Sequence, residues 1–154
     1  MWKVTQPRIF RARISDADAI HQVLNGVAAE GGPERNGIEG LVTPDSVAQW
    51  MRDLGDRGAL FVARVGERGV GAAALEPAGE PGAARLRVWV LPAYRRQGIG
   101  TELGRVATQL ARDLGYVRVL GHIPEQNEAA LSYFSSVAGL ENLQPGLRFE
   151  LPLA

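Results

Sequence analysis

Residues 88–104 constrain the fold of this 154-residue chain more than any other segment. Val88 to Leu91 alternates apolar side chains in the manner of a strand, and apolar residues recur at helical spacing from Ile99 to Leu114. The short connection between them carries glycines at positions 98 and 100. The segment therefore predicts a strand that turns directly into a helix, with Gly98 and Gly100 at the exposed start of that helix.

A helix N-terminus of this kind has the properties of an anion site. Its first N–H groups lack intrahelical partners, and the helix dipole is positive at this end. Glycine lets phosphate oxygens approach the backbone, and Arg95 and Arg96 add positive charge. The alternative interpretation is a tight packing turn with solvated arginines. A dinucleotide site is disfavoured because Leu103 stands where a third glycine is needed, and a nucleotide-triphosphate loop would need a lysine.

The rest of the chain alternates strand and helix patterns. Ser15 with Asp18, and Thr43 with Pro44, predict two helix starts, and the glycine-rich stretch from Glu30 to Leu41 predicts a loop. We predict strands at 8–14, 59–65, 70–75, 84–91, 117–120 and 147–151, and helices at 15–30, 43–54, 99–114 and 127–138. This order predicts one α+β domain over residues 1–154, with a mixed sheet covered by helices on both faces.

The bulk composition excludes several classes. Seventeen basic residues balance seventeen acidic ones, so no overall field favours nucleic acid as a partner. The chain has no cysteine, which rules out disulfides and thiolate metal ligands, and we expect no metal site. No stretch approaches the roughly 20 apolar residues that span a bilayer, and the start of the chain lacks the apolar core of a signal peptide. We therefore expect a cytoplasmic protein without a membrane partner.

The central segment resembles the GNAT superfamily of N-acetyltransferases. Their coenzyme A motif is Arg or Gln, two residues, Gly, one residue, then Gly or Ala, and residues 95–100 (RRQGIG) match it completely. The preceding Val-x-Val-x-Pro-x-Tyr of residues 88–94 is equally typical, and the resemblance continues to Asn127-x-x-Ala130 and to Gly139-Leu140. It implies a layered α/β/α fold with a mostly antiparallel sheet of six to seven strands and about four helices.

The same resemblance assigns the residues that would bind acetyl-coenzyme A. The main chain around Val90, from Val88 through Trp89, would hydrogen-bond the pantetheine arm and the thioester. Arg95, Arg96 and the amides of Gln97, Gly98, Ile99, Gly100 and Thr101 would bind the pyrophosphate. Asn127 would touch the pantetheine, although it is also the N-cap that the last helix needs.

Two residues are candidates for proton transfer. Many relatives carry a tyrosine seven residues after the asparagine, but that position is Phe134 here, and Tyr133 stands one residue early. A local bulge would bring Tyr133 to the site as the acid, and otherwise it packs in the helix. Some relatives carry a glutamate base at the position of His122, whose ordinary pKa suits a base, although a lone histidine at a strand end is often structural.

The acceptor side is less constrained by the sequence. Glu30, beside the predicted loop, is a candidate to receive a cationic acceptor, and solvation is its alternative. The Trp89 side chain would line the acceptor pocket, or it would simply pack against a helix. We expect an N-acetyltransferase acting on a primary amine of a small molecule or peptide by direct attack in a ternary complex. The alternative is a non-catalytic regulatory module that binds acyl-coenzyme A. The final strand could also pair with a second copy as a homodimer.

Overall fold

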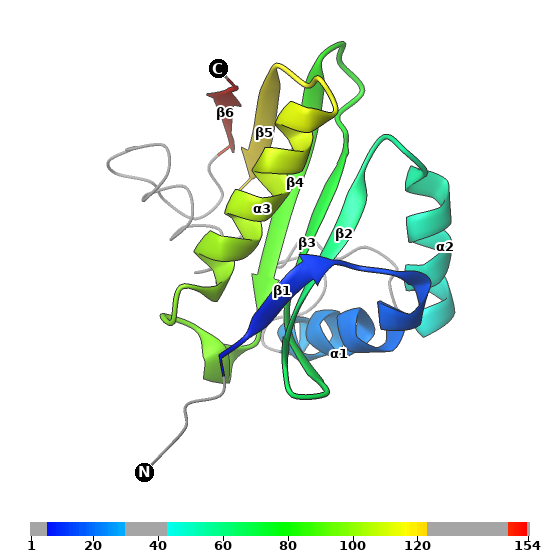
Figure 1. Ribbon diagram of the computed structural model, residues 1–154, viewed down its shortest axis with the longest axis vertical. Coiled ribbons are helices and arrows are strands. Elements are labelled where there is room, and N and C mark those ends of the chain that lie inside the picture. The colour runs from blue at the N-terminus through cyan, green and yellow to red at the C-terminus, as the bar shows by residue number, and fades with distance from the viewer. Residues whose placement is uncertain (1–5, 30–42, 123–147, 154) are drawn as a thin grey trace.

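The computed structural model describes residues 6–29, 43–122 and 148–153. Its core is a six-stranded sheet in the order β1-β2-β3-β4-β5-β6 (Figure 1). The strands are β1 (Arg8–Arg11), β2 (Ala59–Val65), β3 (Arg68–Pro77), β4 (Ala83–Val90), β5 (Arg118–His122) and β6 (Arg148–Pro152). Only the pairing of β4 with β5 is parallel, because α3 (Ile99–Asp113) connects these two strands as a crossover.

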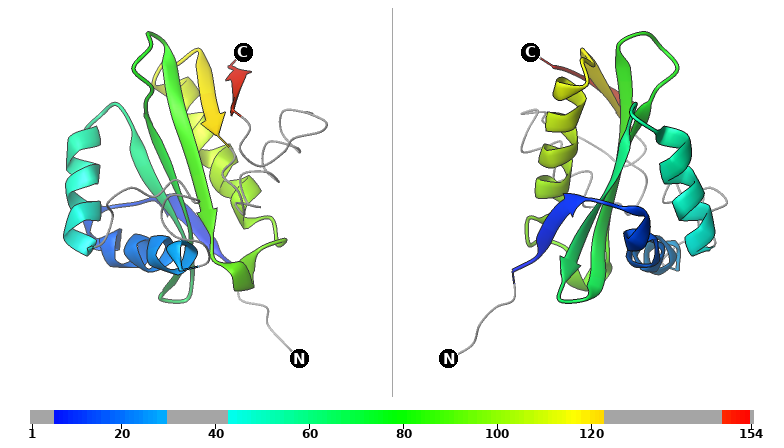
Figure 2. Two further views of the ribbon diagram at one scale, coloured as in Figure 1. Left: turned by 180° about the vertical axis from the view of Figure 1, so that it is seen from behind. Right: turned by 45° about the vertical axis from the view of Figure 1, so that its right-hand side comes forward.

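Helices cover both faces of this sheet. The right-hand view of Figure 2 shows α3 on one face, with α1 (Ala17–Ala28) and α2 (Pro44–Leu54) on the other. Alternate side chains of each strand supply the two halves of the core. Leu86, Val88 and Val90 pack in the α3 half, whereas Trp89 packs in the α1–α2 half. The predicted α+β fold and mostly antiparallel sheet are confirmed. Six strands fall within the predicted range, and the predicted helix at 127–138 lies outside the described residues.

The small side chains of strand β3 allow helices on both faces to pack closely against the sheet. A Cβ added to Gly69 would lie 2.4 Å from the carbonyl oxygen of Ala19 in α1. On the opposite face, a Cβ added to Gly71 would lie 2.9 Å from Leu103 of α3. Gly71 also pairs with Val90, so this close approach fixes the first turn of α3 beside the end of β4. A strand that is buried on both faces in this way accounts for the continuous apolar run in the sequence.

The start of α1 differs from the prediction. β1 ends at Arg11, and Ile14–Asp16 forms a 3-10 turn (η1), so Ser15 is exposed and does not cap the helix. The buried Asp16 directly precedes α1, and its side chain makes no capping bond to the helix. It ties the 3-10 turn to the sheet instead, because it accepts a hydrogen bond from the Arg13 amide (2.8 Å) and pairs with Arg64 of β2 (2.8 Å). The Thr43 cap is confirmed, since its hydroxyl oxygen accepts a hydrogen bond from the Ser46 amide at 3.0 Å.

Smaller boundary differences follow from the turns. The β2–β3 hairpin turns at Gly66 and Glu67 alone, so β3 begins two residues earlier than predicted. A second 3-10 turn, η3 (Pro92–Tyr94), was not predicted and separates β4 from the glycine turn.

Candidate coenzyme and acceptor site

Strand β4 continues past the end of its pairing with β5. The parallel pairs run from Ala83–Arg118 to Leu86–Gly121, and β4 then extends four residues further, to Val90 (Figure 1). β5 ends at His122, whose backbone pairs with Arg148 of β6. The sheet is thus split between β4 and β5 along residues 87–90 among the described residues.

The backbone groups at this split can be oriented from the neighbouring hydrogen bonds. The Leu91 amide donates to the Val70 carbonyl (2.9 Å), and the Ala78 amide donates to the Ala83 carbonyl (3.0 Å). In an antiparallel pair, consecutive residues turn their N–H and C=O groups to opposite sides. Odd-numbered residues of β4 therefore bond toward β3, and Val88 and Val90 direct their main-chain groups toward the β5 side, beyond the last β4–β5 pair.

One of these groups has a side-chain partner. The Nε atom of Arg95, which is half-buried, donates to the carbonyl oxygen of Val90 at 3.0 Å. A main-chain carbonyl at the split is thereby bonded to a residue of the glycine turn. The sequence motif predicted a phosphate role for Arg95 and carried no signal for this contact, because it depends on the 3-10 turn that brings the chain back.

The turn itself has the geometry of an anion cradle. Arg96 and Gly98 both have positive φ (63° and 82°), and Gly98 is directly followed by the right-handed helix α3. A left-handed residue next to a right-handed one makes successive amides converge on one point, which is a recognised anion-binding concavity. Arg96 is the only described non-glycine residue with positive φ, and backbone strain of this kind is found mostly at functional sites.

Helix α3 begins directly behind the cradle. Its first i to i−4 bond runs from the Glu102 amide to the Gly98 carbonyl (3.0 Å), so the amides from Gly98 to Thr101 precede the intrahelical ladder. A Cβ added to Gly98 would meet nothing within 4 Å, which leaves room for a ligand above these amides. The Ile99 side chain is buried in the core, so only its amide can contribute.

The charge around this helix start is favourable for an anion. The acid of the first turn, Glu102, accepts hydrogen bonds from Arg105, including one from Nε at 2.9 Å. The hydrogen bond from Arg105 outweighs burial and lowers the pKa of Glu102, which keeps this carboxylate ionised and paired. Arg96 and Gln97 are exposed at the mouth of the cradle.

These features fit a pyrophosphate at the cradle and an extended amide-bearing arm along the split. Converging amides, a positive helix end and open space above Gly98 suit the pyrophosphate. The Val88 and Val90 main chain, beyond the last described β4–β5 pair, suits the amide-bearing arm, because a pantetheine arm carries amides that can pair with a strand.

Comparison with known proteins agrees with this geometry. A model described as the Acetyltransferase (GNAT) family matches residues 30–139, well over half of the chain. The chain belongs to the GNAT acetyltransferase family. A search of curated proteins found no significant match.

Solved structures of GNAT proteins share its fold. A phosphinothricin acetyltransferase from Sinorhizobium meliloti in complex with AcCoA has a TM-score of 0.74 at 15% identity, covering 97% of this chain and 89% of its own. A ribosomal-protein-alanine N-acetyltransferase from Brucella melitensis has a TM-score of 0.71 at 24% identity, covering 94% and 96%. The PaiA N-acetyltransferase from Thermoplasma acidophilum in complex with coenzyme A has a TM-score of 0.64 at 15% identity, covering 96% and 99%.

In this GNAT chain, the residues predicted for the coenzyme are brought together in part. Val88, Val90 and the cradle at 95–101 form one continuous edge, and the end of β5 at His122 lies beside its start. The Trp89 side chain is 1% exposed in the α1–α2 half of the core, which agrees with the packing alternative for this residue. The coenzyme contact through its main chain stays a prediction. Glu30, Asn127 and Tyr133 lie outside the described residues.

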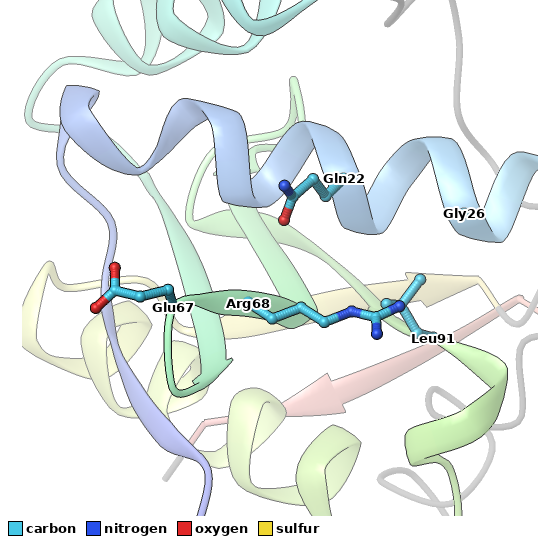
Figure 3. A pocket seen from close by; sticks show the side chains of 5 residues that line it. All are labelled: Gln22, Gly26, Glu67, Arg68 and Leu91. Carbon is cyan, nitrogen blue, oxygen red and sulfur yellow. The ribbon is translucent and has the colours of Figure 1, made fainter.

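A pocket that no sequence pattern predicted lies next to the end of β4. It has a volume of about 480 Å³ and lies between α1 and the β2–β3 turn. Figure 3 shows the Arg68 side chain reaching along it toward Leu91, with Gln22 and Gly26 on α1 above. Arg68 lies 5.8 Å from the Tyr94 ring, in cation–π geometry. Of the residues that line the pocket, Leu91 directly follows β4, and none belongs to the cradle.

The described residues also bear on metal binding and membrane insertion. The described residues hold no group of three or more histidine, cysteine, aspartate or glutamate side chains placed to bind a metal ion. Within the same residues, every helix is too short or too polar to traverse a lipid bilayer.

Proposed function

We propose that this GNAT chain is an N-acetyltransferase that moves acetyl from acetyl-coenzyme A to a primary amine, by direct attack in a ternary complex. The observation that carries the proposal is the continuity of the β4–β5 split with the left-handed cradle at Arg96 and Gly98. An acyl donor with a pyrophosphate at one end and an amide-bearing arm needs both parts in line. Membership in the GNAT family supports the same donor.

Bound acetyl-coenzyme A would supply an activated acyl thioester. The chain would contribute position and polarisation. The cradle amides from Gly98 to Thr101 would hold the pyrophosphate, and the Val88 and Val90 main chain would orient the arm. Arg95 would release the Val90 carbonyl as the arm pairs there. In the overall reaction the amine nitrogen forms a bond to the acetyl carbon, the carbon–sulfur bond breaks, and the amine proton ends on the thiol or solvent.

His122 and Tyr133 are our candidates for the base that accepts the amine proton and the acid that protonates the leaving thiolate. Both assignments are tested by pH–rate profiles of His122→Ala and Tyr133→Phe with a responsive amine. Loss of the acid-side limb of the profile in His122→Ala, and of the basic-side limb in Tyr133→Phe, is the expected result. Profiles identical to the parent protein would leave proton transfer to solvent and exclude both residues.

The proposal as a whole is tested by thiol release. The purified protein is mixed with acetyl-coenzyme A and a panel of amines that includes amino acids, their amides, polyamines and peptide N-termini. Amine-dependent release of free thiol, with the acetylated amine identified by mass spectrometry, is the expected result. If calorimetry shows that acetyl-coenzyme A binds but no amine in the panel is acetylated, the chain is a coenzyme-binding regulatory module.

A further inference from the structure

The class of acceptor can be inferred from the sheet face that an amine must use, provided that the proposed function holds. At β4 one face is closed by α3, whose Leu103, Ala107 and Ala111 are fully buried against the sheet. The right-hand view of Figure 2 shows this helix packed along that face of the sheet. An amine that reaches an acyl group held in the β4–β5 split must therefore approach from the α1–α2 side.

The cover on the α1–α2 side ends at Arg87. The β4 side chains on this face are Arg85, Arg87 and Trp89, because the intervening residues pack in the α3 half of the core. Trp89 is 1% exposed beneath the helices, the Arg87 side chain is 26% exposed, and Arg85 is exposed. Arg87 also directly follows Leu86, the last β4 residue paired with β5. The end of the helical cover and the start of the split thus coincide at this arginine.

Arg87 is held in one orientation by its neighbours. Its Nε donates to Oε1 of Glu76 at 3.0 Å, its Nη2 donates to the same oxygen, and the Trp50 indole donates to Oε2 at 3.4 Å. The guanidinium carbon lies 5.5 Å from the Trp50 ring and 5.9 Å from the Trp89 ring. The two rings meet edge to face at 6.5 Å. Such a cage fixes a guanidinium before a ligand arrives and so lowers the entropic cost of binding.

Among the described residues next to Arg87, arginines outnumber carboxylates. Glu76 lies opposite Arg85 in the backbone register and accepts hydrogen bonds from Arg87, so two guanidinium groups lie near one carboxylate. Arg118, further along the face, is balanced by Glu80, which accepts a hydrogen bond from it, and by Glu150 at 3.4 Å. A cationic amine with no acidic group would meet net repulsion beside Arg85 and Arg87, whereas a carboxylate matches the planar fork of a guanidinium.

We propose that the acceptor is an amino acid or a similarly small primary amine that carries a carboxylate, and that Arg85 and Arg87 bind this carboxylate. The caged Arg87 would fix the orientation of the acceptor beside the split, and the exposed Arg85 would close on the carboxylate from the solvent side. The amine end of the acceptor would then point along the sheet face toward the Val88 main chain.

The test compares each amino acid with its own amide in the thiol-release assay. The members of each pair differ in the carboxylate and, through it, in the basicity of the α-amine, so kcat/KM is calculated on the concentration of uncharged amine. On that basis the parent protein should prefer the acid form by roughly 10- to 100-fold, the range of one charge-assisted hydrogen bond. Arg85→Met should reduce kcat/KM for the acid by a similar factor and leave kcat/KM for the amide unchanged, so that the preference disappears.

Arg87 needs a paired variant, because its removal alone would strand Glu76 in a half-buried site. Arg87→Met combined with Glu76→Gln removes both charges and keeps the side-chain volume. The double variant should lose the preference for the acid while calorimetry shows unchanged affinity for coenzyme A. Arg87→Lys alone, which keeps the positive charge, should retain part of the preference. Arg112→Met, on the exposed last turn of α3, is the matched control and should change neither quantity.

The outcomes separate this inference from the function on which it rests. Turnover of amides or polyamines at rates equal to those of amino acids would overturn the inference and leave the acetyltransferase intact. Unchanged acid-to-amide ratios in both Arg85→Met and the double variant would do the same. Coenzyme binding without turnover of any amine would overturn both.

Discussion

Replacing Gly98 by alanine tests the cradle most directly. Gly98 has φ +82°, and the left-handed region costs a residue with a Cβ about 1–2 kcal/mol. Alanine recovers roughly 0.5 kcal/mol by restricting the unfolded chain, which leaves a net loss of about 1 kcal/mol. For a chain of this size such a loss lowers the melting temperature by about 2–4 °C.

The effect on binding is separate from this strain. The added Cβ meets no protein atom within 4 Å, so it occupies the space above the cradle amides. If the pyrophosphate lies there, at least one charge-assisted contact is lost, which lowers the affinity for coenzyme A roughly 10- to 100-fold. Isothermal titration calorimetry with coenzyme A measures this loss, and thermal unfolding measures the strain.

Gly79 supplies the matched control. Its φ is +84°, a Cβ there also meets nothing within 4 Å, and it lies in the turn before β4, at the opposite end of that strand from the cradle. Gly79→Ala should lower the melting temperature as much as Gly98→Ala and leave the affinity for coenzyme A unchanged. If Gly98→Ala weakens binding no more than Gly79→Ala does, the pyrophosphate does not sit on this turn.

Three further predictions follow from individual contacts. Arg96→Asn should raise the free energy of unfolding by roughly 0.5–1 kcal/mol, because asparagine tolerates a left-handed φ, and thermal unfolding measures this gain. The same variant should weaken coenzyme A binding in low salt, as measured by calorimetry. A variant less stable than the parent protein would show that Arg96 is not strained. Burial raises the pKa of Asp16, but the bonds from Arg13 and Arg64 outweigh it and hold the pKa below its ordinary value. This carboxylate therefore stabilises the fold above its unfolded-state pKa and ceases to do so as the pH falls through the lower folded-state pKa. Urea unfolding at pH values from about 6 to 2 should therefore show a smaller acid loss for Asp16→Asn than for the parent, and parallel curves would contradict this. Gly69→Ala should cost about 1–3 kcal/mol in urea unfolding, since the new Cβ would lie 2.4 Å from the Ala19 carbonyl oxygen, and a neutral effect would show that α1 can move away.

Local patterns were sufficient where neighbouring residues decide the structure. The Thr43 cap, the strand at 59–65 and the helix that begins at Ile99 were predicted correctly, because caps, alternation and helical spacing act over a few residues. Ser15 failed as a cap for the converse reason. Asp16 is held by Arg64, which is 48 positions away in the sequence, and no local pattern records such a partner.

The cradle was predictable and the acceptor face was not. The motif at 95–100 specifies a glycine at position 98, where the backbone is left-handed, and arginines where charge is needed, so its chemistry can be read from consecutive residues. Glu76, Arg87 and Trp50 come from β3, β4 and α2, and carry no shared motif.

The sequence by itself determined the strand–turn–helix unit from Val88 to Gly104 and, with it, the resemblance to the family. The tertiary structure alone decided where the pairing of β4 with β5 ends, that Arg95 bonds the Val90 carbonyl, and that two tryptophans and a glutamate cage Arg87 at the same point. The physical reason is the range of the interactions. Backbone hand and helix dipole act within one turn of chain, whereas register, layer packing and charge pairing join residues that only folding brings together.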